Sequence, residues 1–304
     1  MRTSFIVTLL IGFLTLPYIS VKAQEREPEL KVTSAWEGVG ESKTLNIKAT
    51  LLKPGIYSIL FNFTELNNIM QAPQELRVVK GTGIIFTLRG TDPQERFGCK
   101  YNCYYALGYE SSRMDSNFVY RLPYSTHRTE PVRGQSNYVI GKHVLGGGIV
   151  SDRIDINFHL EQGDTIFAMR KGEVVRVKNE STKIYSLTIL QGDGTVCTYS
   201  VFNKGEFLVK EGDVVYPGTP LRINENEAQR NENYLLRVNV YYPVVNPDFG
   251  EKKRAIAFLQ HHYNPVFATD KGNMKIEGHM ELRATSTPEL IQKEMTKKEK
   301  KRTK

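Results

Sequence analysis

The sequence predicts an all-β protein built from two successive β-rich domains. In the stretch YSILFNFTEL, Tyr57, Ile59, Phe61 and Phe63 alternate with other residues at a period of two, as expected for one face of a strand. Gly-Asp and Pro-Gly turn signals recur at short intervals further along, and helical periodicity is absent from the first half. Sixteen tyrosines and fourteen phenylalanines suit pleated surfaces, and 304 residues suffice for two cores.

Residues 1–23 have the composition of a signal peptide. Arg2 gives a positive start, and a mostly apolar run extends from Phe5 to Ile19. Val21 and Ala23 satisfy the small-residue rule for cleavage, which makes Gln24 the expected mature N-terminus. We therefore expect export to the periplasm or cell surface, with no transmembrane span in the mature chain.

Residues 24–119 are expected to form a β-sandwich, immunoglobulin-like in shape. LKPG and KGTG are turn signals that separate short strand-like runs such as ELRVV and IIFTLRG. The Cys–Trp–Cys pattern of true immunoglobulin domains is missing, so only the architecture is predicted.

Three cysteines bear on the redox state. In an oxidising compartment Cys99 and Cys103, in CKYNC, are candidates for a short local disulfide. Because the loop is short, such a bond would add little stability through chain entropy. Cys197, in GTVCTYSVF, is expected to be a small buried apolar residue. A zinc site made of these three is not expected, because paired CxxC spacing is absent.

A second β-rich domain is expected at residues 120–250, followed by a hairpin extension at 251–287 and a basic tail at 288–304. Turns are predicted at four places in the domain, and a short helix is predicted from Pro288. The turn signals are Gly163 after a strand-like INFHLEQ, Gly192 to Gly194, Gly212 and Gly218.

Positive charge is concentrated in the tail. Removing the signal peptide, with Arg2 and Lys22, takes the net charge from +8 to 8 − 2 = +6. The stretch QKEMTKKEKKRTK contributes seven cations and two glutamates, a net of +5, so the folded part carries about +1. This distribution excludes a nucleic-acid-binding face. Two interpretations of the tail remain open: a solvated end, or adhesion to an anionic surface such as a membrane or cell-wall polymer.

Three ordered segments of the second domain carry a family resemblance. IDINF, GDTIFAMRKGEVV and FLVKEGDVVYPGTPL resemble the lysostaphin-like (LytM-type) zinc endopeptidases of bacterial cell walls. The resemblance implies a β-barrel and sandwich hybrid for residues 120–250. It also implies a zinc site with an Asp and histidine ligands, and a further catalytic histidine.

By this resemblance, a first pair of metal ligands is only partly retained. Asp155 matches the family's Asp ligand, and Ser151 stands four residues earlier, where its histidine partner is usual. His143 fits a longer spacing found in some members. His143 and Asp155 are therefore possible remnants of a metal site.

The remaining family positions lack imidazoles. Val201 stands where the catalytic histidine of the "YxHL" strand belongs, and Asn233 and Leu235 stand for the two histidines of the closing "HLHFEV" strand. Zinc hydrolysis needs three protein ligands and an open position for water. We therefore expect no catalytic residues, no bound metal and no cofactor.

Three functional hypotheses follow. The first is a non-catalytic scaffold that binds cell-wall peptidoglycan or an envelope protein such as a wall amidase, which is what degenerate members of the family imply. The alternative is an active zinc metalloendopeptidase that cleaves peptidoglycan cross-links with displaced ligands, namely His143 and Asp155 with His159 or His261 completing the shell. His261 and His262 are adjacent, so on a strand they would point to opposite faces.

The third hypothesis is a carrier domain modified on a lysine. Lipoyl and biotinyl domains share the "GDxVxxG" turn, but they carry the modified lysine in an "MKM"-like hairpin tip. The nearest segment here is MRKG, residues 169–172, which departs from that pattern.

Overall fold

The computed structural model describes residues 28–141, 143–144, 148–149, 152–178, 184–203, 205–224, 234–250 and 255–302. Throughout these residues the protein is almost entirely β-structure, and the predicted fold class is confirmed. The expected signal peptide, residues 1–23, lies outside the described part. Among the described helices, none has the length and apolar character needed to cross a membrane.

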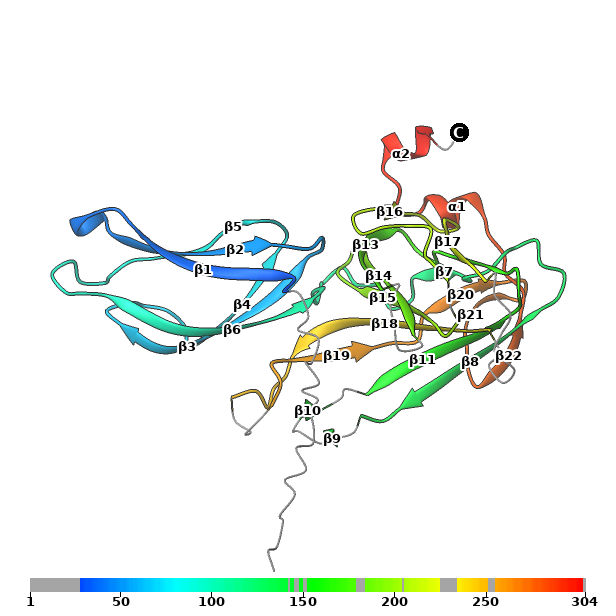
Figure 1. Ribbon diagram of the computed structural model, residues 1–304, viewed down its shortest axis with the longest axis horizontal. Helices are drawn as coiled ribbons and strands as arrows, with labels where there is room; N and C mark the ends of the chain where they lie inside the picture. Colours follow the sequence, from blue (N-terminus) through cyan, green and yellow to red (C-terminus); the bar gives the residue numbers. More distant parts are fainter. Residues whose placement is uncertain are drawn as a thin grey trace, which may run out of the picture.

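The N-terminal half is a sandwich of two three-stranded antiparallel sheets (Figure 1). The first sheet has the order β1-β2-β5, from β1 (Leu30–Glu37), β2 (Thr44–Leu51) and β5 (Gly83–Leu88), with a 3-10 turn η1 (Gly40–Ser42) after β1. The second has the order β4-β3-β6, from β3 (Tyr57–Asn67), β4 (Gln74–Val79) and β6 (Gly98–Leu107).

The predicted alternation in β3 forms the core of this sandwich. Tyr57, Ile59, Phe61 and Phe63 are all at most 5% exposed, and they belong to one apolar cluster. Phe61 packs edge-on against Phe86 of the facing sheet, with ring centroids 4.9 Å apart. Burial of this face between two sheets is what stabilises the fold of the N-terminal domain.

The two nearby cysteines of β6 do not form the disulfide for which they were candidates. Cys99 and Cys103 are both free, and they lie opposite Leu66 and Phe61 of β3, with a bulge in β3 between Phe63 and Glu65 while β6 continues unbroken. Four residues of extended strand span about 13 Å, whereas disulfide-linked Cα atoms lie within about 7 Å. Both thiols face the sandwich core, and burial raises their pKa values. Cys197 is fully buried, as predicted.

The C-terminal half is organised around a nine-stranded sheet. Its order is β16-β13-β14-β15-β18-β11-β8-β22, and β19 pairs with the far end of β18. The strands are β8 (Val132–Val139), β11 (Arg153–Leu160), β13 (Gly172–Lys178), β14 (Tyr185–Gln191), β15 (Val196–Val201), β16 (Val214–Val215), β18 (Tyr234–Val245), β19 (Phe258–His262) and β22 (His279–Leu282).

Three smaller sheets complete this domain (Figure 1). They are β21-β20-β7, β12-β17 and β10-β9, from β7 (Val119–Arg121), β9 (His143–Val144), β10 (Gly148–Ile149), β12 (Thr165–Phe167), β17 (Pro220–Ile223), β20 (Val266–Thr269) and β21 (Gly272–Lys275). Residues 255–287 supply β19 and β22 to the large sheet and form the antiparallel hairpin β20–β21, whose strand β20 also pairs with β7.

The predicted turns are borne out by backbone conformation. Gly163, Gly194, Gly212 and Gly218 all have φ between 85° and 92°, the left-handed region that favours glycine. Two short helices end the chain, α1 (Pro288–Gln292) and α2 (Lys297–Arg302). The helix expected from Pro288 is therefore present, and Thr287 caps it by accepting a 3.2 Å hydrogen bond from the backbone N–H of Leu290.

Candidate functional site

The two faces of the nine-stranded sheet differ in character because side chains alternate along each strand. Ile156 and Phe158 of β11, with Val238 of β18, are fully buried in the apolar core beneath the sheet. The intervening residues are polar: Asn157 lies opposite Arg237 across the β11–β18 ladder. On the other side of β18, Arg237 lies opposite Ser200 of β15 and Asn239 lies opposite Thr198. A continuous polar face therefore crosses β15, β18 and β11.

Asp155 lies at the centre of this polar face and is only 4% exposed. Its Oδ1 accepts a 2.7 Å hydrogen bond from Nδ2 of Asn239. Nε of Arg153 lies 3.0 Å from Oδ1 and 3.2 Å from Oδ2, and Nε of Arg237 lies 3.5 Å from Oδ2. We call Asp155, Arg153, Arg237 and Asn239 the Asp155 cluster. It surrounds one carboxylate with two guanidinium groups and one amide.

The chemistry of this cluster does not suit a zinc ion. A ligating carboxylate must offer a lone pair to the metal, whereas both oxygens of Asp155 already accept from cationic or amide donors. A divalent cation would also be repelled by Arg153 and Arg237. Within the described ranges, no three His, Cys, Asp or Glu side chains come together as a metal-binding group. The described residues around Asp155 therefore do not fit the metal that the family resemblance implies.

One histidine lies beside the Asp155 cluster. His262 of β19 pairs with Tyr241 of β18 and stacks against its ring at 5.1 Å between centroids. Burial lowers the pKa of His262 to about 4, and the neighbouring Asp155 only partly offsets this. Its Nε2 lies 3.2 Å from Oε1 of Gln260, while its buried Nδ1 has no hydrogen-bond partner. The imidazole is therefore neutral at ordinary pH.

The other candidate histidines do not converge on Asp155. His159 lies four residues further along β11, and burial together with Arg133 and His279 lowers its pKa. His261 stacks on Tyr242, the residue beside the Tyr241 that contacts His262, so the two adjacent histidines do point to opposite faces. That prediction is confirmed.

The residues aligned with family positions lie in different parts of the structure. Val201 is 1% exposed and packs in the apolar core, so it lies on the opposite face from Asp155. The backbone of Leu235 pairs with His159, and the backbone of His143 pairs with Ile149 in β9–β10, but their side chains lie outside the described set. Ser151 and Asn233 also lie outside the described residues.

Sequence reasoning missed the residues that the sheet brings to Asp155. By register, Arg237 and Asn239 of β18 are the side chains on its face, and Arg153 joins them from β11 itself. A signal was available in YLLRVNV, where Arg237 and Asn239 are the only polar side chains, spaced by two, in a run that is otherwise apolar. The resemblance to the family's "HLHFEV" strand instead pointed to Asn233 and Leu235 as the site positions.

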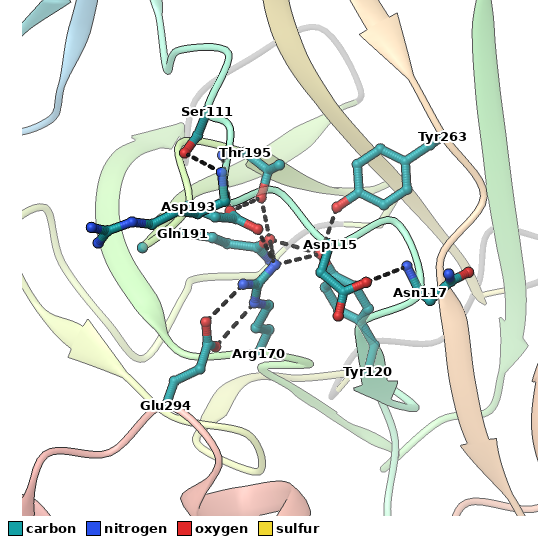
Figure 2. A network of polar contacts seen from close by, with 12 residues as sticks. Ser111, Asp115, Asn117, Tyr120, Arg170, Gln191, Asp193, Thr195, Tyr263 and Glu294 are labelled. Carbon is teal, nitrogen blue, oxygen red and sulfur yellow. Dashed lines mark hydrogen bonds and ion pairs between the residues drawn. The ribbon is translucent and has the colours of Figure 1, made fainter.

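A second polar cluster lies inside the C-terminal domain and is shown in Figure 2. Nη1 of Arg170 donates to Asp193 at 2.9 Å and to the hydroxyl of Tyr120 at 3.1 Å. The guanidinium lies 3.8 Å above the ring of Phe118. Its remaining edge makes two parallel hydrogen bonds to Glu294, at 3.0 and 2.7 Å.

The Arg170 network has the properties of a structural joint. Burial would lower the pKa of Arg170, but the bonds to Glu294 and the nearby Tyr120 and Asp193 raise it. Burial likewise raises the pKa of Tyr120 well above its usual value. Neither Arg170 nor Tyr120 changes protonation near neutral pH, so neither supplies an acid or a base. The network ties the C-terminal segment to the rest of the C-terminal domain.

Comparisons with known proteins add little to this geometry. No family model matches the sequence, and no curated relative matches it. Among solved structures the chain is similar to Helicobacter pylori Csd3, at 14% identity and a TM-score of 0.27, covering 77% of this chain and 72% of that chain. It is also similar to a putative peptidase M23 from Pseudomonas aeruginosa and a zinc containing peptidase from Vibrio cholerae.

The sequence identities and TM-scores of these two structures are similarly low. The Pseudomonas match has 15% identity and a TM-score of 0.25, covering 60% of this chain and 82% of that one. The Vibrio match has 12% identity and a TM-score of 0.26, covering 69% and 81%. Superpositions this poor carry no argument about activity.

Proposed function

We propose that this protein is an exported, non-catalytic LytM-like protein that acts as a binding or regulatory scaffold in the bacterial cell envelope. The ordered motifs of residues 120–250 and the signal-like N-terminus support the compartment and the family. The Asp155 cluster is the single observation that carries the non-catalytic part. Two guanidinium groups take up the carboxylate that a metallopeptidase would use to hold its ion.

The same cluster gives the scaffold a recognition chemistry. The side chain of Arg153 is 40% exposed and that of Arg237 is 28% exposed, so both guanidinium groups reach the surface. Both contact Asp155 through Nε, and an incoming carboxylate would meet the outer Nη groups. Asp155 pairs with both arginines, and Nε of Arg237 also donates a 3.3 Å hydrogen bond to Oδ1 of Asn157. These contacts hold the arginines in place and reduce the entropy lost when a ligand binds.

The ligand class that fits is a peptide bearing a free carboxylate. Asn137 of β8 lies opposite Asp155 in the ladder and accepts a 2.7 Å hydrogen bond from Gln135, so amide groups extend the polar face beyond the arginines. Amide donors and acceptors suit a peptide backbone. Cell-wall peptide, free or displayed by a protein partner such as a wall amidase, meets this description.

A pair of measurements on the purified full chain separates this proposal from the zinc metalloendopeptidase alternative. Metal content is measured after growth with added zinc, and release of soluble peptide from isolated peptidoglycan is followed over time. We expect substoichiometric metal and no release. One equivalent of protein-bound zinc together with cleavage would overturn the proposal.

Binding is tested by co-sedimentation with the same insoluble peptidoglycan. The Arg153→Gln/Arg237→Gln variant should lose about tenfold or more in affinity, since each charged hydrogen bond contributes roughly 1 kcal/mol or more. Lys31→Gln/Lys48→Gln, which removes the same charge from exposed positions of β1 and β2, is the matched control and should bind like the parent protein. Equal binding by all three proteins would place recognition elsewhere.

A further inference from the structure

The C-terminal residues 288–302, here called the C-terminal arm, are held against the rest of the C-terminal domain. Met295 is only 8% exposed, and Glu294 makes the paired hydrogen bonds to Arg170 shown in Figure 2. Further along, Glu299 accepts from Nζ of Lys171 at 2.8 and 3.0 Å and from the hydroxyl of Tyr216 at 2.6 Å. The arm therefore has a defined position, and its two contacts use adjacent residues of the segment MRKG.

These contacts engage the acidic side chains of the arm and leave its basic side chains exposed. Glu294 and Glu299 are its only acidic side chains after α1. They form ion pairs with Arg170 and Lys171 of the C-terminal domain. The Lys171 and Tyr216 hydrogen bonds keep the pKa of Glu299 well below its usual value, so it stays ionised and attached. Beyond Gln292, the exposed side chains of the arm are cationic apart from Thr296.

Helix geometry explains which cations face outward. Lys297 and Lys301 are four residues apart, and both lie on the side of α2 away from Glu299 at about 100° per residue. Lys293, Lys298 and Arg302 are exposed as well. Lys293 also lies 4.1 Å from the Phe118 ring. From Lys293 onward, the outer side of the arm is thus a surface of five exposed cations, and the exposed carboxylate of Glu289 lies before it, in α1.

We propose that this cationic surface docks the protein on an anionic phospholipid bilayer. Four of its five cations are lysines, which act as point charges and do not demand the bidentate geometry that arginine favours, so they suit a diffuse layer of phosphate headgroups. The sequence of α2, KKEKKR, has no apolar side chain to insert, so attraction is Coulombic. In Figure 1, α2 lies at the outer edge of the molecule, where a flat surface can reach it.

This surface is independent of the Asp155 cluster, because the two lie on different elements. Its test uses the full chain and vesicles of phosphatidylglycerol and phosphatidylcholine, compared with vesicles of phosphatidylcholine alone. Co-sedimentation should require the anionic lipid. It should be strong near 0.05 M salt, where screening is weak, and largely lost by about 0.5 M salt.

Variants locate the contact. Each lysine near an anionic bilayer contributes about 1 kcal/mol, or roughly fivefold in partitioning, so Lys297→Gln/Lys298→Gln/Lys301→Gln should bind about 100-fold more weakly. Lys31→Gln/Lys48→Gln/Lys100→Gln removes equal charge from the N-terminal sandwich and should bind like the parent. All six side chains are exposed, and unchanged thermal melting verifies that each variant folds.

Two outcomes would overturn the proposal. One is an equal loss of binding in both triple variants, which would show a dependence on net charge alone. The other is retention of a soluble anionic polyphosphate by the parent protein without any binding to anionic vesicles, which would assign the surface to a polymer.

Discussion

Asn239 of β18 donates a 2.7 Å hydrogen bond to Asp155 of β11, on the one face of the large sheet where polar side chains from neighbouring strands meet. This pair, with Arg153 and Arg237, makes the carboxylate of Asp155 part of the fold. In Asp155→Asn the two partly exposed guanidinium groups lose the anion that the nearly buried Asp155 side chain supplies. We expect the free energy of unfolding to fall by about 2 kcal/mol.

Urea denaturation at neutral pH measures this change. A double-mutant cycle with Arg237→Gln should show coupling, because the second substitution removes a partner that the first has already stranded. Additive effects would mean that Asp155 and Arg237 do not depend on one another.

The neutral state of His262 predicts an acid-sensitive contribution to stability. Burial lowers its folded pKa from 6.5 to about 4, so the unfolded state binds a proton more readily. The stability contributed by the neutral imidazole is therefore complete above about pH 6.5 and is lost as the pH falls toward 4. After allowance for partial exposure, we expect a loss of about 1 to 2 kcal/mol.

The comparison that isolates this group is His262→Phe, which keeps an aromatic ring beside Tyr241 and removes the titration. Chemical denaturation at about pH 7 and about pH 4.5 should show a larger loss in the parent than in the variant. Parallel losses in the two proteins would exclude His262 as the source.

Two glycines with nearly the same backbone conformation should differ sharply when changed to alanine. Gly194 has φ of 92° and Gly163 has φ of 85°, so both substitutions carry the strain of a left-handed residue, about 1 kcal/mol. A Cβ at Gly194 would also collide with the backbone oxygen and ring of Tyr109, whereas a Cβ at Gly163 would enter open space. We expect Gly194→Ala to cost about 3 kcal/mol.

Thermal melting of the two variants measures the difference. Tyr109 donates its backbone N–H to the oxygen of Gly194 at 3.1 Å, at the point where the two domains join. Gly163→Ala is the control for backbone strain alone, and similar melting temperatures for both variants would contradict the steric argument.

The cysteine geometry predicts three free thiols in the oxidised compartment to which the signal-like N-terminus points. Denatured, unreduced protein should therefore react with three equivalents of an alkylating agent by mass spectrometry. Adding reductant should leave the melting temperature unchanged. A mass two hydrogens lower, with only Cys197 alkylated, would show that Cys99 and Cys103 pair.

Local patterns predicted the strands and turns well, because both depend on neighbouring residues. The alternation from Tyr57 to Phe63 and the left-handed Gly163 and Gly218 are examples. The environment of Asp155 was not predictable in the same way. It depends on the register between β11 and β18, and a shift of that register changes which side chains share its face.

The C-terminal arm shows a second limit of sequence reasoning. Its composition indicated either a solvated basic end or adhesion to an anionic surface. Its attachment to the C-terminal domain was not predicted. Glu294 and Arg170 are 124 positions apart, and an ion pair at that separation leaves no local pattern. Cys99 and Cys103 show the opposite case. They are close in the sequence, which suits a disulfide, but the extended strand β6 holds them apart.

The pairing of distant segments has a consequence for how the chain matures. Val132 of β8 meets Leu282 of β22, and Val119 of β7 meets Val266 of β20. A chain emerging from a ribosome or a translocation pore can assemble its first domain early, since β1 to β6 are contiguous. The second domain must wait with an open edge at β8 until β22 has arrived, and during that interval it depends on whatever shields exposed strands from aggregation.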